Sequence, residues 1–182
     1  MPINPRVRRE KLLSAADGYL ELDMAEQALD CLAQIALLPD VADLPADHRI
    51  DLLRGLALRQ LGRHQEAIEV LERADKLKPD QIDTLMALAW CYKRINRVDR
   101  SIELTEKAYE IDPQQAVLMY NLACYFALSG NKQQALSWLG RALRNDPNCR
   151  LMVRDEHDFD SLRHDADFQL LINLSHKSAT ST

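Results

Sequence analysis

The stretch that carries most of the reactive side chains is AWCYKRINRVDR, residues 89–100. It holds a tryptophan, a cysteine and a tyrosine beside four basic side chains, Lys93, Arg94, Arg97 and Arg100. Aromatic rings interleaved with cations are typical of single-strand nucleic-acid binding. The chain of 182 residues is acidic, however, with a net charge of −5 and a pI of about 5.5, so it has no general attraction to phosphate backbones. We therefore expect no nucleic-acid partner and interpret these basic residues as solvated helix ends.

A group of possible metal ligands lies near the C-terminus. It contains two histidines and four aspartates, which are His157, Asp158, Asp160, His164, Asp165 and Asp167. The histidines are seven residues apart, whereas a helical H-E-x-x-H zinc site places them four apart on one face. The spacing therefore predicts no metal site, and we expect no cofactor.

The sequence shows no sign of catalysis, secretion or membrane insertion. It has five glycines and no glycine-rich phosphate loop, and none of its four cysteines lies in a nucleophile motif. These cysteines (Cys31, Cys91, Cys124 and Cys149) are far apart, so disulfides are not expected. The basic N-terminus is not followed by the apolar run of a signal peptide, and no apolar stretch is long enough to span a bilayer. We expect a cytoplasmic protein that is not an enzyme and does not bind membranes.

A period of 34 residues runs through the chain. Three sets of residues show it, each member 34 after the one before: Pro79, Pro113 and Pro147; Ala74, Ala108 and Ala142; and Gly62, Asn96 and Gly130. Such a period is the signature of a helical repeat. An earlier copy fits if five residues are inserted, because Tyr19 and Ala28 lie 39 residues before Leu58 and Ala67.

Each period reads as two amphipathic helices separated by turns. In TLMALAWCYKRI and VLMYNLACYFAL, apolar residues recur every three or four positions, as in a helix with one buried face. Both helices are expected to end at Asn96 or Gly130, residue types that tolerate the left-handed conformation. Small residues in the second helices mark places of close helix approach. Asp112 and Asp146, each followed by proline, are expected to cap the next helix.

These features resemble the tetratricopeptide repeat (TPR) family. The clearest copy matches its pattern with Leu122, Ala123, Phe126, Ala135, Leu139, Ala142 and Pro147. The resemblance implies an all-α fold, a right-handed superhelix (α-solenoid) of antiparallel helix pairs with about four TPR units and a helical cap. It divides a single domain, 1–182, into a degenerate repeat 9–42, a loop insertion 43–47, repeats 48–81, 82–115 and 116–149, a cap 150–175 and a flexible tail 176–182. The segment DEHDFDSLRHDADFQLLINL resembles the ending common after bacterial TPR arrays, and a terminal unit should have a polar outer face.

The same resemblance implies a concave groove, whose residues follow from their places in each repeat. They are Arg49, Leu52, Leu56 and Arg59; Asp83, Met86, Trp90, Lys93 and Arg94; and Val117, Tyr120, Asn121 and Cys124. The middle of this surface is apolar and aromatic, and its flanks are basic. An alternative is that a terminal segment folds into the groove and makes these residues part of the core. The Lys and Asn residues of the chaperone-tail carboxylate clamp are absent from the matching places except at Asn121, so that role is not expected.

The function expected from this surface is a non-catalytic protein–protein interaction module. A partner protein or peptide segment, apolar with some acidic groups, would lie in the groove. Two alternatives stay open: a small TPR chaperone for a secreted client, as in type III secretion, and a self-assembling structural subunit that forms a homo-oligomer.

Overall fold

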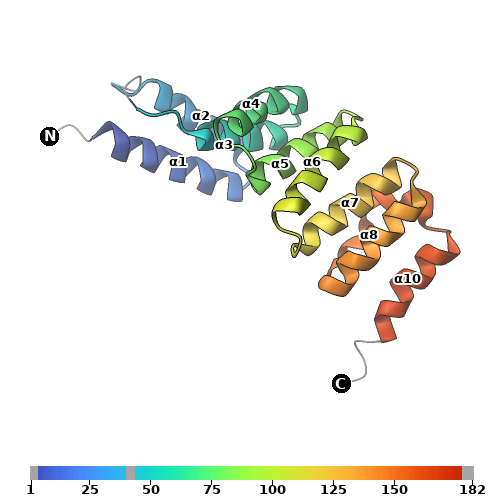
Figure 1. Ribbon diagram of the computed structural model, residues 1–182. Coiled ribbons are helices and arrows are strands. Elements are labelled where there is room, and N and C mark those ends of the chain that lie inside the picture. Colours follow the sequence, from blue (N-terminus) through green and yellow to red (C-terminus); the bar gives the residue numbers. More distant parts are fainter. Residues whose placement is uncertain (1–3, 40–43, 178–182) are drawn as a thin grey trace. The chain divides into compact units, whose positions relative to one another are not determined.

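The computed structural model describes residues 4–39 and 44–177, and every regular element in these ranges is a helix (Figure 1). The chain divides into two compact units, Met1–Ile95 and Asn96–Thr182. Unit 1 contains α1 (Pro5–Glu21), α2 (Ala25–Ala36), α3 (His48–Gln60), α4 (His64–Leu77) and α5 (Ile82–Arg94). Unit 2 contains α6 (Val98–Ile111), α7 (Ala116–Leu128), α8 (Lys132–Asn145), α9 (Cys149–Asp155), the 3-10 helix η2 (His157–Leu162) and α10 (Ala166–Lys177). None of the described helices is long and apolar enough to cross a membrane.

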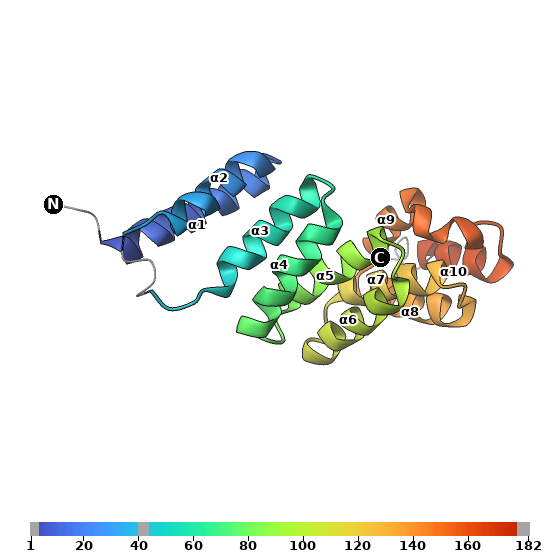
Figure 2. The ribbon, with the colours of Figure 1, turned by 90° about the horizontal axis from the view of Figure 1, so that it is seen from above.

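Unit 1 is built from helix pairs packed side by side. Helix α1 pairs with α2 and α3 pairs with α4, as Figure 2 shows from above. Helix α3 also packs against α1 and α5, so the first helices of successive pairs are neighbours. Leucines and alanines fill the space between α1, α2 and α3, and the most buried of them are Ala16, Ala28, Leu32 and Ala57. This is the arrangement that the 34-residue period predicts.

The turn inside each pair is closed by a residue with positive φ. Gly62 (φ 74°), Asn96 (φ 60°) and Gly130 (φ 76°) all adopt the left-handed conformation, which confirms the prediction for these positions. The backbone N–H after the turn residue returns to a carbonyl in the last helical turn: Arg63 N donates to Leu58 O at 2.9 Å, in the pattern of a Schellman motif.

The turns between pairs differ from the sequence-based expectation. Helices α7 and α9 begin at Ala116 and Cys149, three residues after Pro113 and two residues after Pro147, and not at the prolines. The aspartates instead close the loop, because Asp112 Oδ1 accepts from Gln114 N (3.1 Å) and Asp146 Oδ1 accepts from Asn148 N (2.9 Å). An aspartate readily accepts the N–H two residues on, so the Asp-Pro pair makes a turn and the prediction of an N-cap is wrong.

The small residues of the second helices are buried as expected. Ala67, Ala74, Ser101, Ala108, Ala135 and Ala142 are all at most 1% exposed. The close approach is strongest at Gly55 on α3, where an added Cβ would lie 2.4 Å from Leu71 Cγ on α4.

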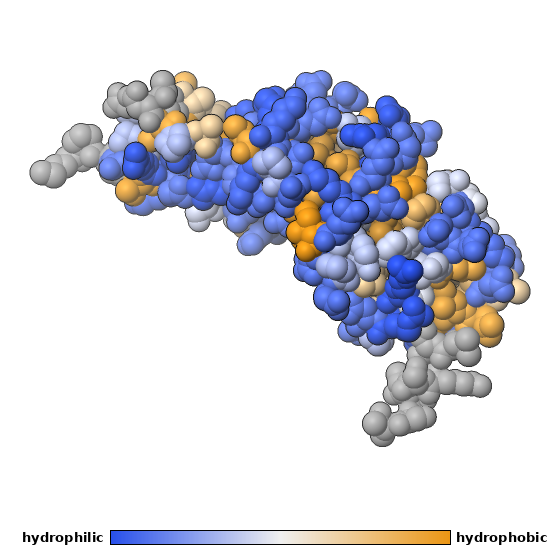
Figure 3. Space-filling model, viewed as in Figure 1, coloured by the Kyte–Doolittle hydropathy of each residue, from blue (hydrophilic) through white to orange (hydrophobic). Residues whose placement is uncertain are grey.

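Unit 2 ends in a C-terminal segment, α9 through α10, that packs on α7 and α8. Phe159 and Phe168 are fully buried, with ring centroids 5.5 Å apart. Its outer surface also exposes apolar side chains, which are Leu151 (76%), Met152 (45%) and Leu170 (58%), and Figure 3 shows apolar surface over α10. This segment is therefore less polar outside than the sequence predicts for a cap. The expected insertion 43–47 and tail 176–182 lie partly outside the described residues.

Candidate partner-binding surface

The neighbouring helices α1, α3 and α5 line a cavity of about 410 Å³ in unit 1. Its walls are Glu10, Leu13, Ser14, Asp17, His48, Arg49, Leu52, Leu53 and Asp83. Three of these, Arg49, Leu52 and Asp83, are among the groove residues expected from the sequence. The carboxylates of Glu10, Asp17 and Asp83 outnumber the cations here, so this end of the surface is not basic.

Arg49 is held by carboxylates of its own unit. Its guanidinium donates to Glu10 Oε1 at 2.8 Å and to Asp47 Oδ2 at 2.6 Å. Hydrogen bonds from Arg49 hold the pKa of Asp47 and of Glu10 below their usual values. Asp47 is also the N-cap of α3, because its Oδ1 accepts a hydrogen bond from Arg49 N at 3.1 Å. Because Arg49 already binds two carboxylates of this chain, its role is structural, and it is not available to bind an acidic side chain of a partner.

Replacing Asp47 by asparagine isolates the charge of this cap, because the amide oxygen can still accept from the backbone. We expect a loss of about 1–3 kcal/mol in the free energy of unfolding at pH 7, the cost of removing a charge-assisted hydrogen bond. The folded-state pKa of Asp47 is depressed, so its contribution is present above the unfolded pKa and lost as pH falls through the folded one. The difference between wild type and Asp47→Asn should therefore shrink below about pH 4, measured by urea denaturation. Glu66→Gln, which breaks the exposed pair with Arg63, is the control and should show a much smaller change, because an exposed ion pair contributes little to stability.

A basic–aromatic cluster, formed by Arg59, His64, Trp90 and Arg94, lies at the other end of α3 and α5. The guanidinium carbons of Arg59 and Arg94 are 5.4 and 5.5 Å from the Trp90 ring centroid. The ring of His64, at the start of α4, meets Trp90 edge-on with centroids 5.3 Å apart. Among the described residues, neither guanidinium has a hydrogen bond or an ion pair. The cluster therefore presents two cations in fixed positions without a bound acid.

His64 adds a polar atom to the cluster. Its Nδ1 is buried and has no hydrogen-bond partner among the described residues. Burial and the charge of Arg94 hold its pKa below the usual histidine value, which favours the neutral imidazole. The sequence analysis took groove residues only from the first helix of each repeat, so it missed His64, which begins a second helix, α4. The one sequence signal for His64 is its position directly after the turn at Gly62.

Apolar side chains connect the cavity with the basic–aromatic cluster. Leu52 and Leu56 on α3 and Met86 on α5 are half-buried. Leu52, Leu56 and Arg59 follow one another at spacings of four and three on α3, and Met86 and Trp90 are four apart on α5, so each set lies on one face of its helix. Lys93 is half-buried on the same helix. The surface thus changes from acidic, through apolar, to basic along two adjacent helices.

The remaining basic residues of AWCYKRINRVDR form ion pairs outside this surface. Arg97 donates to Asp99 with an ion-pair distance of 3.2 Å, and Arg100 pairs with Glu103. They belong to unit 2 and to the exposed side of α6, which fits solvated helix ends.

In unit 2 the expected groove residues are not brought together on an open surface. Val117 is exposed and Asn121 is half-buried, whereas Tyr120 and Cys124 are 4% and 2% exposed. Phe159 covers Tyr120, with ring centroids 6.0 Å apart. For these two residues the structure follows the alternative in which a terminal segment covers the surface, so they are left out of the partner-binding site.

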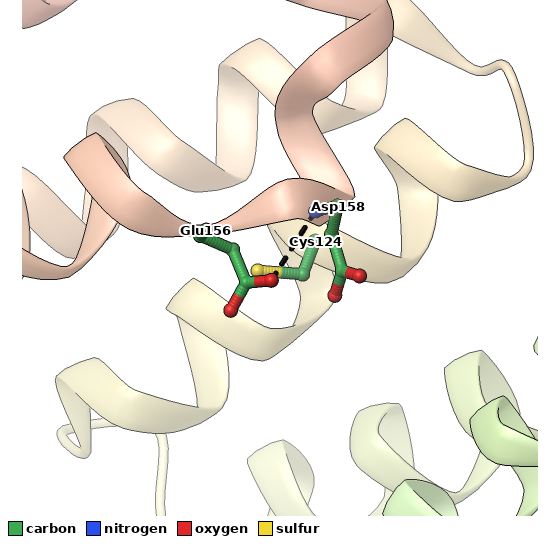
Figure 4. A group of neighbouring side chains, drawn as sticks. All are labelled: Cys124, Glu156 and Asp158. Atoms are coloured by element: carbon green, nitrogen blue, oxygen red, sulfur yellow. Dashed lines mark hydrogen bonds between the residues drawn. The ribbon is translucent and has the colours of Figure 1, made fainter.

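Cys124 lies beside two carboxylates of the C-terminal segment. Its Sγ and one carboxylate oxygen each of Glu156 and Asp158 all lie within 4.8 Å of one another (Figure 4). Glu156 Oε1 also accepts from Asp158 N at 3.2 Å, the bond drawn as a dashed line. Burial raises the pKa of the Tyr120 phenol, and Cys124, Glu156 and Asp158 act in the same direction, so its hydroxyl belongs to this group. The histidines considered in the sequence are not part of it.

All four cysteines are buried, none of them forms a disulfide with another described cysteine, and none is more than 8% exposed. Burial raises the pKa of Cys31 and Cys149, and that of Cys91 to about 11. Since the thiolate is the reactive form, we expect a thiol reagent at pH 7 to label the native protein at least ~100-fold more slowly than the urea-unfolded chain. One cysteine that labels at the unfolded rate would contradict this burial.

Comparison with known proteins identifies the family. The family model described as Psidin, N-terminal TPR repeats region, matches residues 42–147. The chain belongs to this TPR family. No curated protein sequence matches it.

Solved TPR structures share the fold. A MamA crystal structure is 21% identical, with a TM-score of 0.67 over 77% of this chain and 79% of that one. The MSR-1 form of MamA is 19% identical, with a TM-score of 0.69 over 98% and 99% of the two chains. YrrB, a TPR protein with an unusual peptide-binding site, is 20% identical, with a TM-score of 0.66 over 80% of this chain and 73% of its own. At these identities the likeness shows an α-solenoid of helix pairs.

Membership in the TPR family confirms the expected class of function. TPR proteins are protein-interaction scaffolds and not enzymes, and this chain is one of them. The groove expected from the sequence lies on the first helix of each pair, and in unit 1 these helices are α1, α3 and α5. We call their expected shared surface the inner face of unit 1.

Proposed function

We propose that this TPR protein binds an acidic and apolar segment of a partner protein on the inner face of unit 1. Apolar side chains of the segment pack on Leu56 and Met86, and an acidic side chain binds Arg59 and Arg94. The observation that carries the proposal is the position of these two guanidinium groups over Trp90, unneutralised by any described carboxylate.

The guanidinium groups of Arg59 and Arg94 are already ordered before a ligand binds. A guanidinium over an indole ring gains about 0.5–2 kcal/mol from the cation–π interaction and loses side-chain freedom before any ligand arrives. Binding a carboxylate then costs less ordering, and guanidinium–carboxylate hydrogen bonds are the strong, bidentate kind. Arg49 shows the contrast, because its carboxylate partners are already internal.

The apolar side chains of this surface contribute binding energy through burial, and its charged side chains determine the orientation of the bound segment. Half-buried Leu52, Leu56 and Met86 offer a limited surface, so affinity from this face alone is expected near the micromolar range. The acidic cavity around Asp17 and Asp83 repels a second acid at the other end. The segment is therefore expected to bind in one direction, with its acid at the basic–aromatic cluster.

Selection of short displayed peptides tests this proposal with a defined probe. Peptides enriched by the wild type should pair Asp or Glu with apolar residues, and Arg59→Glu/Arg94→Glu should weaken their binding by at least about 30-fold. Arg141→Glu/Arg144→Glu on α8 is the matched control, since it makes the same charge change and also removes an arginine that lies over a tryptophan, Trp138. Enriched peptides without acids, or equal binding by both variants, would refute the proposal.

Tryptophan fluorescence gives an independent readout. The chain has two tryptophans, so Trp138→Phe leaves Trp90 as the reporter. A selected peptide should change Trp90 emission with the same affinity that direct binding gives. An unchanged emission at saturation would place the peptide elsewhere.

The cytoplasmic location belongs to the proposal as well. Four buried cysteines that form no disulfide with one another fit a reducing compartment. The two alternatives differ from this proposal in what occupies the same face. A chaperone for a secreted protein would bind a hydrophobic client there. A self-assembling subunit would bind a second copy of this chain, which light scattering would detect as a concentration-dependent increase in mass.

A further inference from the structure

Three potential metal ligands lie close together inside unit 2, whereas the proposed partner-binding residues belong to unit 1. Cys124 comes from α7, while Glu156 is the N-cap of η2 and Asp158 lies in the first turn of η2 (Figure 4). Cys124 is 2% exposed and Asp158 8%, and Glu156 is half-buried. One thiol and two carboxylates thus point into a place that is mostly shielded from water.

A second observation points to a ligand at this place. Tyr120 lies one helical turn before Cys124 and is 4% exposed, yet its hydroxyl makes no hydrogen bond of good geometry among the described residues, and the neighbouring Cys124 thiol is a weak partner. A buried phenol of this kind normally has a partner, because leaving it unpaired is costly. A water molecule bound to an ion at the thiol and carboxylates would provide one.

We propose that Cys124, Glu156 and Asp158 bind a divalent cation of the zinc class. Zinc accepts thiolate and carboxylate ligands in tetrahedral geometry, and a thiolate favours it over magnesium or calcium. Three protein ligands leave a fourth position for water, which the Tyr120 hydroxyl contacts. Binding deprotonates the Cys124 thiol, and the proton passes to solvent as the sulfur–metal bond forms.

The geometry of the three donors fits such an ion after small adjustments. Zinc–sulfur and zinc–oxygen bonds of about 2.3 and 2.0 Å place ligand atoms about 3.3–3.7 Å apart around a tetrahedron. The three atoms here lie within 4.8 Å, so side-chain rotations can close the difference. Arg163 holds the backbone that carries Glu156, since its guanidinium donates to the carbonyls of Glu156 (2.8 Å) and Val153 (3.2 Å).

Cobalt titration of the full chain tests the proposal. The protein is treated with a chelator, kept reduced with a phosphine, and titrated with Co²⁺, which gives a near-ultraviolet charge-transfer band only when a thiolate binds it. We expect this band to saturate at one equivalent and to disappear when Zn²⁺ is added. A folded wild type without the band would overturn the proposal.

Two kinds of variant assign the ligands. Cys124→Ala should lose the band, whereas Cys149→Ala, which removes another buried thiol of unit 2, should keep it; the reverse pattern overturns the assignment. Glu156→Gln keeps an oxygen for the Asp158 N–H and Asp158→Asn keeps the side-chain shape. Each should weaken Co²⁺ binding at least tenfold. If Cys124→Ala does not fold, as judged by circular dichroism, these two variants decide, and unchanged affinity in both would reject the site.

Discussion

Replacing Phe159 by alanine is expected to lower the free energy of unfolding of unit 2 by about 3–5 kcal/mol. The side chain is fully buried, and its ring touches Tyr120 of α7 and Phe168 of α10. Removing it leaves a cavity between the C-terminal segment and the helix that it covers, and both aromatic contacts are lost. Urea denaturation followed by circular dichroism measures the loss.

The same variant shows which surface the C-terminal segment protects. In a repeat protein, a weakened terminal element can open without unfolding the rest. Thiol labelling read peptide by peptide should then accelerate at Cys124 far more than at Cys31. Leu170→Ala is the matched control, because this leucine lies in the same segment but is 58% exposed, and its effect should stay within about 0.5 kcal/mol. Equal stability of the two variants would mean that the segment does not cover α7.

The helix pairs and their inner turns could be predicted from the sequence because local chemistry determines them. A residue that tolerates positive φ must follow each first helix, and Gly62, Asn96 and Gly130 recur at the spacing that the repeat requires. The starts of the next helices could not be placed in this way. An Asp-Pro pair suits both an N-cap and a closed turn, and Asp112 adopts the turn by accepting from Gln114 N.

The candidate site was only partly predictable for a different reason. The repeat pattern predicts that Arg59, Trp90 and Arg94 lie on the same surface, near the C-terminal ends of two adjacent first helices. They do not show that both guanidinium groups lie over one ring, or that His64 meets it edge-on. Those contacts depend on side-chain conformations and on the position of α4, the second helix of its pair, which begins with His64. The burial of Tyr120 depends on a segment about forty residues later in the chain, which no repeat pattern describes.

Replacing Gly55 by alanine is expected to destabilise unit 1 by about 1–3 kcal/mol, although alanine is the better helix former. The added Cβ would lie 2.4 Å from Leu71 Cγ and 2.5 Å from Leu71 Cδ2. Leu71 is fully buried on α4 and cannot rotate away without displacing its neighbours, so α3 and α4 must separate. The leucines and arginine that α3 contributes to the partner-binding surface would shift with it.

Gly18→Ala supplies the comparison that separates packing from helix propensity. Gly18 lies within α1, and a Cβ added there meets no atom within 4 Å. This variant should stabilise unit 1 by about 0.5–1 kcal/mol, because alanine loses less backbone entropy in a helix. The same chemical change is thus expected to have opposite signs at two positions of one unit, as measured by urea denaturation. Stabilisation by Gly55→Ala would mean that α3 and α4 pack less closely than this structure has them, and the positions of Arg59 and Leu56 relative to α5 would need to be reconsidered.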